Sequence, residues 1–184
     1  MTFKMVWGVT GSGYLLKESI DLMKELQENY DLEITVVLSK EGAVVVKWYK
    51  QWDYLNEVVN RVRVEVTPNN PFIAGPLQLG KYDFFLVCPV SANSVAKIVY
   101  GIADTLITNC VAQAIKGGVI AYLFPSDQHL EPIVTSRPNG SSLILKIRDI
   151  EIDNIQKLKK MEGIVVLSDF KEIKRLILER LHEK

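Results

Sequence analysis

The feature that most constrains this chain is a regular alternation between short apolar runs and longer segments whose apolar residues recur every three or four positions. The first pair shows it: Phe3 to Val9 is an apolar run, and the segment from Tyr14 to Asn29 carries Leu16, Ile20 and Met23 at helical spacing. Strand-length apolar runs that alternate with amphipathic helices are typical of a parallel sheet covered by helices on both faces. The pattern therefore predicts a doubly wound α/β fold with a mainly parallel sheet.

The same alternation continues along the whole chain. We expect further strands at residues 32–38, 61–67, 82–88, 119–124 and 163–167. We expect further helices at residues 42–50, 91–100, 105–115 and from 169 onward, with loops at 68–76 and 136–142. Because 184 residues suit one domain better than two, residues 1–184 are expected to form a single Rossmann-like (flavodoxin-like) domain.

Charge and cysteine usage argue against several classes of function. Lys and Arg number 22, as do Asp and Glu, so no global positive field attracts nucleic acid or anionic lipid. Cys88 and Cys110 lack the spacing of a zinc or iron–sulfur site, so we expect no metal. No apolar stretch reaches the roughly 18 residues of a membrane span, and no signal peptide is visible. We expect a soluble, cytoplasmic protein that binds neither membrane nor nucleic acid.

The loop after the first expected strand combines glycines with hydroxyl side chains: Thr10, Gly11, Ser12 and Gly13. It leads directly into a helix, so free backbone N–H groups and the positive end of the helix dipole would face an anion. This arrangement favours a phosphate site. A tight turn without a ligand is the alternative, because a short glycine motif is weak evidence by itself.

The next loop favours a mononucleotide over a dinucleotide. A dinucleotide-binding loop would have a glycine where Leu16 stands and an acid at the end of the second strand, but this chain has Ser39 and Lys40 there. A hydroxyl beside a cation suits a phosphate monoester, which favours FMN over NAD. Ser39 is equally suited to capping a helix.

The run after the expected strand at 82–88 is Pro89-Val90-Ser91-Ala92-Asn93-Ser94, followed by Lys97, Gly101 and Ala103-Asp104-Thr105-Leu106. It resembles the Pro-Ala-Ser-Ala-Asn-Thr signature of the homo-oligomeric flavin-containing cysteine decarboxylase family and that family's following Lys, Gly and Ala-Asp-x-Leu pattern. The glycine loop and Ser39 also fall where the family has its phosphate loop and strand-end hydroxyl. The resemblance covers most of the first 125 residues.

The resemblance implies noncovalently bound FMN and a homo-oligomer built from trimers, with flavins at subunit boundaries. Ser91, Asn93 and Ser94 would bond the ring edge or the ribityl hydroxyls, while Pro89 and Ala92 would shape the slot for the ring. Helix capping is the alternative for Ser91 and Asn93. Asp104 would bond ribityl hydroxyls or a neighbouring subunit, or would simply be a solvated cap. The full set of expected cofactor-binding residues is Thr10, Gly11, Ser12, Gly13, Ser39, Pro89, Ser91, Ala92, Asn93, Ser94, Asp104, Ser126 and Asp127.

The loop Pro125-Ser126-Asp127-Gln128-His129 departs from the decarboxylases, which have a Pro-x-Met-Asn-x-x-Met motif there. They also carry an early catalytic histidine, whereas the histidines of this chain are His129 and His182. These differences argue against decarboxylation. The loop and the following tail are similar to the archaeal flavoprotein branch, which includes an archaeoflavoprotein that accepts electrons from ferredoxin and FMN-dependent dihydromethanopterin reductases.

We therefore expect an FMN protein that accepts and passes on electrons, with ferredoxin or a nicotinamide as donor and with its catalytic residues unidentified. The alternatives are a dihydromethanopterin-type reductase, a decarboxylase or flavin prenyltransferase, and a regulatory subunit that binds FMN poorly. The aromatic segment from Trp48 to Tyr54 is either part of an interface or part of the core.

Overall fold

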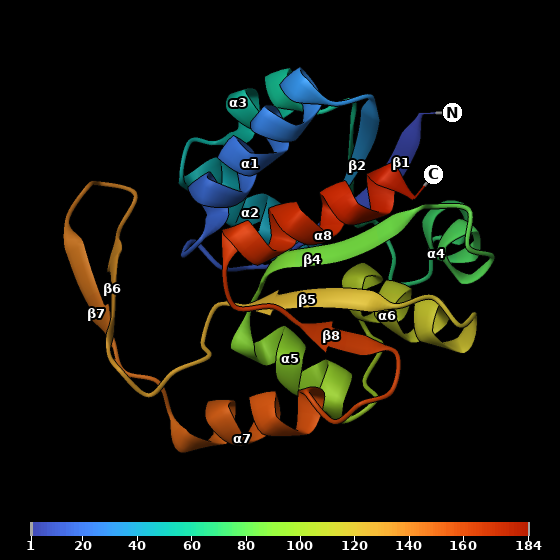
Figure 1. Ribbon diagram of the computed structural model, residues 1–184. Coiled ribbons are helices and arrows are strands. Elements are labelled where there is room, and N and C mark those ends of the chain that lie inside the picture. Colours follow the sequence, from blue (N-terminus) through green and yellow to red (C-terminus); the bar gives the residue numbers. More distant parts are fainter. Residues whose placement is uncertain (1, 184) are drawn as a thin grey trace.

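The apolar runs of the sequence come together as one parallel sheet. The computed structural model describes residues 2–183, and its six-stranded sheet has the order β3-β2-β1-β4-β5-β8 with every neighbouring pair parallel (Figure 1). The strands are β1 (Phe3–Val9), β2 (Leu32–Leu38), β3 (Arg61–Val64), β4 (Phe84–Val90), β5 (Ala121–Pro125) and β8 (Ile164–Val166). The prediction of a doubly wound, mainly parallel sheet is confirmed.

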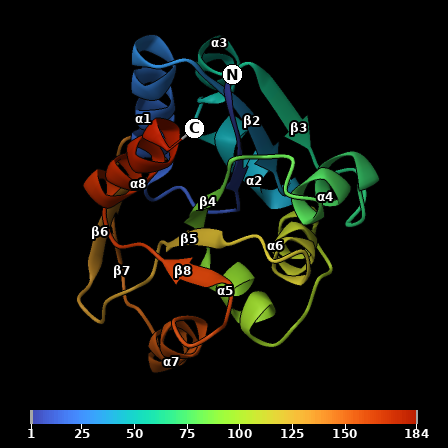
Figure 2. The same ribbon diagram turned by 45° about the vertical axis from the view of Figure 1, so that its right-hand side comes forward.

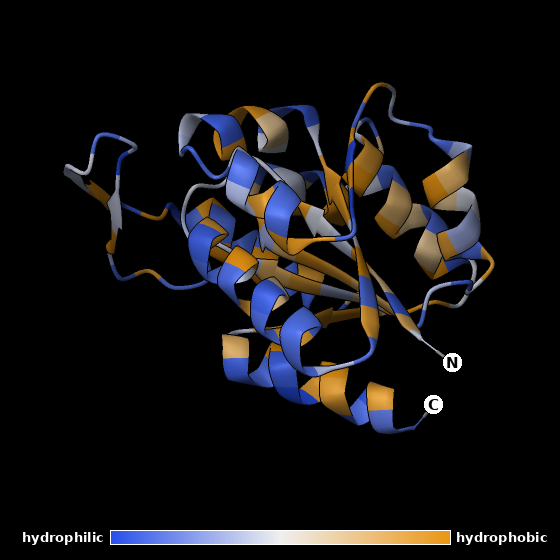
Figure 3. Cartoon of the chain, turned by 90° about the horizontal axis from the view of Figure 1, so that it is seen from above, coloured by the Kyte–Doolittle hydropathy of each residue, from blue (hydrophilic) through white to orange (hydrophobic). Residues whose placement is uncertain are grey.

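Helices cover both faces of this sheet, as Figure 2 shows from a second direction. One face packs against α1 (Leu16–Asn29), α2 (Lys40–Trp48), α3 (Trp52–Val58) and α8 (Phe170–His182). The other packs against α4 (Pro71–Gln78), α5 (Ala92–Val99), α6 (Leu106–Lys116) and α7 (Asp149–Leu158). Figure 3 shows the consequence for the sequence: the strands are mostly hydrophobic, while the helices carry hydrophobic and hydrophilic stripes.

The central strands are apolar along their whole length because they contribute to both cores. In β1, Met5 and Trp7 face the core under α1, while Val6 faces the core under α4 and α6. Trp7 is completely buried, and its indole Nε1 donates a hydrogen bond of 2.7 Å to the carbonyl oxygen of Cys88 in β4. The indole thus joins two neighbouring central strands by a side-chain bond.

The prediction of a loop at 68–76 is wrong in part, because α4 begins within this segment. The Asn70 side chain accepts a 3.0 Å hydrogen bond from the backbone N–H of Phe72, and Pro71 occupies the first helical turn, where proline is tolerated. The three prolines and the glycine of this segment had indicated a turn. The third strand is also shorter than predicted and ends at Val64.

A small antiparallel hairpin lies outside the main sheet and projects from the body (Figure 1). It consists of β6 (Ile133–Ser136) and β7 (Ser142–Leu145), and we call residues 133–145 the arm. The predicted loop at 136–142 corresponds to its turn, whereas its two strands were not predicted. Val134 and Ile144 pair across the hairpin and are 66% and 65% exposed, so one face of the arm is apolar and uncovered.

Two further searches of residues 2–183 gave negative results. No helix in this part of the chain has the length and apolar content that a membrane crossing needs. The same residues contain no cluster of three or more His, Cys, Asp or Glu side chains that would hold a metal ion.

The buried indole bond generates a stability prediction. We expect Trp7→Phe to lower the free energy of unfolding by about 2 to 4 kcal/mol, because it leaves a cavity and removes the buried donor to Cys88. Trp48→Phe is the matched control: Trp48 is 64% exposed, and its replacement should change stability by no more than about 0.5 kcal/mol. Urea unfolding of both variants measures the difference, and equal losses would contradict the prediction.

Candidate functional site

The predicted site residues gather where the winding of the sheet reverses. Strands β1 and β4 are neighbours, but β1 leads into α1 on one face and β4 leads into α5 on the other. In doubly wound folds such a reversal opens a crevice at the carboxyl ends of the strands, where ligands bind. We call the ends of β1, β2, β4 and β5, with the loops that follow them, the carboxyl edge.

Thr10 fixes the shape of this crevice. Its hydroxyl donates to the carbonyl oxygen of Pro89 at 3.1 Å and accepts from the backbone N–H of Ser91 at 2.7 Å. The backbone N–H of Thr10 also donates to the Pro89 carbonyl, at 3.1 Å. Thr10 is 1% exposed, so its hydroxyl joins the two strand ends instead of facing the crevice. Thr10 is therefore a positioning residue in this structure.

The end of β5 is joined to β4 in a similar way. The backbone N–H of Ser126 donates to the Val90 carbonyl at 3.0 Å, and the buried Ser126 hydroxyl points to the same oxygen at 3.5 Å. Gln128 donates to the carbonyls of Pro125 and Leu167, at 3.0 Å and 2.8 Å, and so joins the loop to the end of β8. These bonds hold the loop after β5, which carries Asp127, against the ends of β4 and β8.

The glycine loop after β1 leaves backbone donors free. Within residues 2–183, the N–H groups of Gly11, Gly13 and Tyr14 donate to no protein acceptor, whereas that of Ser12 bonds the Thr10 carbonyl at 2.8 Å. Leu15 then starts α1 from a left-handed conformation, with φ of 67°. Free N–H groups at the start of a 14-residue helix are the feature that the predicted anion site requires.

Gly13 has a close neighbour in Tyr49. A Cβ at this position would lie 2.3 Å from Cζ of Tyr49, because the tyrosine ring packs directly on the loop. A cavity of about 310 Å³ opens beside this contact, lined by Tyr14, Tyr49 and residues 134–136 of the arm among others. The arm therefore borders the same space as the glycine loop.

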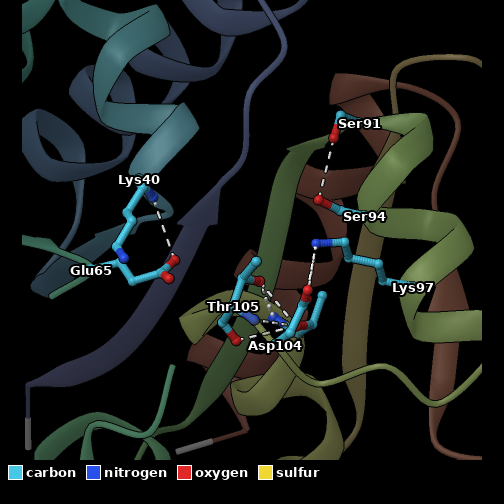
Figure 4. Close-up of polar contacts among 8 residues, drawn as sticks. Lys40, Glu65, Ser91, Ser94, Lys97, Asp104 and Thr105 are labelled. Atoms are coloured by element: carbon cyan, nitrogen blue, oxygen red, sulfur yellow. Dashed lines mark hydrogen bonds and ion pairs between the residues drawn. The ribbon is translucent and has the colours of Figure 1, made fainter. Parts of the chain in front are cut away.

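At the end of β2, Ser39 takes the capping role that the sequence left open. Its hydroxyl oxygen accepts a 2.9 Å bond from the backbone N–H of Gly42 at the start of α2. Its own hydrogen remains available for a ligand oxygen. The sequence reasoning missed Glu65, which is 6% exposed and accepts from the backbone N–H of Lys40 at 3.4 Å (Figure 4). Glu65 thus places a carboxylate at the start of α2.

The start of α5 carries polar side chains that are not used in capping. Ser91 occupies the cap position, but its side chain makes no capping bond and instead donates to the Ser94 hydroxyl at 3.2 Å (Figure 4). Asn93 is exposed and has no protein partner among residues 2–183. The carboxyl of Asp127 lies near the backbone N–H of Ala92 and the Ser126 hydroxyl, and both favour its charged form. Burial and the nearby Glu151 raise the pKa of Asp127 above its ordinary value.

Three helices thus begin at this edge, and two of them already face a carboxyl group of the chain itself. Glu65 lies at the start of α2 and Asp127 at the start of α5. Within residues 2–183, the N–H groups at the start of α1 are free and have no acid bonded to them. The start of α1 is therefore the part of the carboxyl edge that suits an anionic group best.

Asp104 lies apart from the other predicted residues. It forms an ion pair of 2.9 Å with Lys97 in the last turn of α5, while Asn93 lies in the first turn (Figure 4). The next residue, Thr105, caps α6 by accepting from the backbone N–H of Thr108.

The aromatic segment divides between core and surface. Tyr49, Trp52 and Tyr54 pack against the core under α1, and the Tyr54 hydroxyl donates to Asp21 at 3.0 Å. Trp48 points outward and is 64% exposed. Both expectations for this segment thus have a structural basis, since three of its aromatic residues belong to the core and one lies on the surface.

Comparison with known proteins places the chain among flavin proteins. A family model described as Flavoprotein matches residues 1–181. An uncharacterized protein of Methanocaldococcus jannaschii is 47% identical over 98% of this chain and 97% of its own length. A dihydromethanopterin reductase (acceptor) of the same organism is 40% identical over 75% of this chain, but the match spans only 59% of that enzyme. The crystal structure of Burkholderia xenovorans DmrB in complex with FMN, described as a cubic protein cage for redox transfer, has a TM-score of 0.80 and 32% identity, covering 98% of this chain and 96% of its own.

The capping bond of Ser39 generates a prediction. We expect Ser39→Ala to lower the free energy of unfolding of the ligand-free protein by about 1 kcal/mol, because the Gly42 N–H loses its acceptor. Asn70→Ala removes the equivalent cap of α4 and should cost a similar amount. Thermal unfolding of both variants measures the losses. A stable Ser39→Ala protein beside a destabilised Asn70→Ala protein would show that Ser39 does not act as a cap.

Proposed function

The chain belongs to the flavoprotein family, and we propose that it holds FMN noncovalently at the carboxyl edge and uses it to accept and pass on electrons. The observation that carries this proposal is the set of free N–H groups at the start of α1, which have no protein acceptor among residues 2–183. FMN has one terminal phosphate, whereas a dinucleotide brings a diphosphate and a second ribose. The two neighbouring helix starts, which already hold Glu65 and Asp127, would repel further phosphate.

Each group of residues has a role in this proposal. The N–H groups of Gly11, Gly13 and Tyr14 hold the phosphate, and the Ser39 hydroxyl donates its free hydrogen to a phosphate oxygen. The side chains of Asn93 and Ser94 bond the polar edge of the flavin or its ribityl chain. Thr10 keeps the crevice open through its bonds to β4. The bound flavin supplies the redox chemistry, while the protein orients it and excludes water.

Electron transfer is supported over decarboxylation by the site and by the relatives. The histidine nearest to the carboxyl edge in sequence, His129, is exposed and follows the loop after β5. The relatives of 32% identity or more whose names state a function are dihydromethanopterin reductases and a protein described in terms of redox transfer. A dihydromethanopterin-type reduction is therefore the second candidate. Ferredoxin or a nicotinamide is the proposed donor, in a cytoplasmic setting compatible with two buried free thiols.

We further propose that residues 1–184 act as one domain within a homo-oligomer built from trimers. DmrB, at 32% identity, forms a cage. This chain leaves apolar side chains uncovered on the arm and at Trp48, which suits burial against further copies. Light scattering at micromolar concentration should give a mass of at least three chains. A monomer still saturated with FMN would contradict this proposal.

Flavin binding is tested through Asn93. The protein should purify with FMN or be reconstituted with it, and Asn93→Ala should weaken binding by about tenfold or more, since a hydrogen bond to a buried ligand group is worth about 1 to 3 kcal/mol. Asn29→Ala, at the exposed end of α1, is the control and should bind normally. Fluorescence titration with FMN measures both affinities, and equal values for the two variants would remove Asn93 from the site.

Redox function is tested by supplying an electron donor without any cysteine substrate. We expect ferredoxin or NAD(P)H to bleach the flavin absorbance under anaerobic conditions. His129→Ala should lower the rate of flavin reduction by less than about twofold, because the exposed His129 side chain is not placed to transfer a proton within a buried site. Carbon dioxide release from a peptide with a C-terminal cysteine is measured in parallel. Rapid release without reduction by either donor would support the decarboxylase alternative.

A further inference from the structure

A cavity of about 240 Å³ lies at the edge of the sheet formed by β3, on the face that carries α4. Figure 2 shows β3 at this edge with α4 nearby. The lining includes Thr35 of β2, Arg61 and Arg63 of β3, Tyr82 and the first residues of α4. Thr35 pairs with Arg61, the first residue of β3, and Tyr82 precedes β4. We call this space the β3–α4 cavity, and its lining residues are separate from those of the carboxyl edge.

The two arginines of this cavity have no counter-ion in the described part of the chain. Arg61 and Arg63 lie on the same face because alternate residues of a strand do so. Within residues 2–183, neither guanidinium forms an ion pair. Two acids toward the amino ends of neighbouring strands contact Lys4: Glu33 lies 4.0 Å from its Nζ, and Asp83 accepts from its backbone N–H at 2.7 Å. Two positive charges thus share one cavity without an acid.

The other polar side chains of the lining can all donate hydrogen bonds. The Asn70 Oδ1 accepts from the backbone N–H of Phe72 at 3.0 Å, which leaves the two hydrogens of the amide nitrogen available. Among residues 2–183, that nitrogen and the hydroxyls of Thr35 and Tyr82 have no protein partner. The backbone N–H of Ile73 already bonds the Asn70 carbonyl. Recognition in this cavity would therefore come from side-chain donors, which suit a group with several acceptor oxygens.

Charge and size restrict what the β3–α4 cavity can hold. A phosphate monoester carries a charge of about −1.5 to −2 at pH 7 and three acceptor oxygens, which matches two guanidinium groups. A single carboxylate would compensate only one of them. Ile73 is 4% exposed, whereas the Phe72 ring is 83% exposed and offers an aromatic surface beside the arginines. The volume lies below the range of about 300 to 1,000 Å³ that is usual for drug-sized ligands, so a dinucleotide is excluded.

We propose that the β3–α4 cavity is a second anion site, which binds a small aromatic phosphate monoester independently of the flavin. Arg61 and Arg63 hold the phosphate oxygens, and the amide nitrogen of Asn70 and the Tyr82 hydroxyl donate to them. The Phe72 ring packs against the aromatic part of the ligand. This site does not depend on the proposed function, because it shares no residue with the glycine loop.

The proposal is tested by calorimetric titration of the FMN-saturated protein with phenyl phosphate, with phenol as the uncharged control. Arg61→Gln and Arg63→Gln should each weaken binding by about tenfold or more, because each removes charge-assisted hydrogen bonds. Phe72→Ala should weaken the binding of phenyl phosphate but not that of inorganic phosphate. Arg175→Gln removes the same charge from α8, on the opposite face of the sheet, and should change the affinity by less than about twofold.

Three outcomes would overturn the proposal. Binding of phenyl phosphate that saturating FMN abolishes would belong to the carboxyl edge. Equal losses in Arg63→Gln and Arg175→Gln would reduce the effect to general charge attraction. No binding by the unchanged protein, with a lower oligomer mass when Arg61 and Arg63 are both replaced by Gln, would assign the arginines to a contact between copies. A protein that binds no FMN would refute the proposed function alone, because the same variants can be titrated without flavin.

Discussion

The bond network of one buried hydroxyl, that of Thr10, determines the shape of the carboxyl edge. By donating to the Pro89 carbonyl and accepting from the Ser91 N–H, it holds the ends of β1 and β4 at a fixed separation. Proline has no N–H to donate, and the pairing of β4 with β5 shifts register between Val87 and Val90. Together with the backbone bond from Thr10 to Pro89, this hydroxyl fixes the start of α5 relative to the glycine loop.

The charge distribution at the carboxyl edge depends on which helix starts already face a carboxyl group of the chain. Carboxyl groups of the chain lie at the starts of α2 and α5, whereas within residues 2–183 the N–H groups at the start of α1 have no protein acceptor. A ligand with several phosphates would meet two acids at such an edge. In the proposed function, selectivity for a single phosphate therefore depends on three helices together and not on the glycine loop alone.

Much of the fold could be predicted from periodicity. In β1 and α1, for example, the spacing of apolar residues directly reflects which faces of the segment are buried. The carboxyl edge was also predictable, since Gly11, Ser39 and Asn93 each follow an apolar strand. Contacts between distant segments were not: Glu65 and Lys40 are 25 residues apart, and nothing in the alternating Arg61–Glu65 segment shows which strand end its acid will reach. Helix α4 was missed because its capping by Asn70 resembles turn chemistry in sequence. The arm strands were missed because four-residue strands give too little periodicity to detect.

The arm has a consequence for how chains of this shape can diverge. It contributes no strand to the main sheet and belongs to neither buried core, yet residues 134–136 line the cavity beside the glycine loop. Lengthening a surface loop costs little, about 0.6 kcal/mol for each doubling. Insertions or deletions in the turn at 137–141 would therefore alter what the cavity admits while the sheet and its helices stay the same. The shape of this cavity and the stability of the fold can thus evolve almost independently in this architecture.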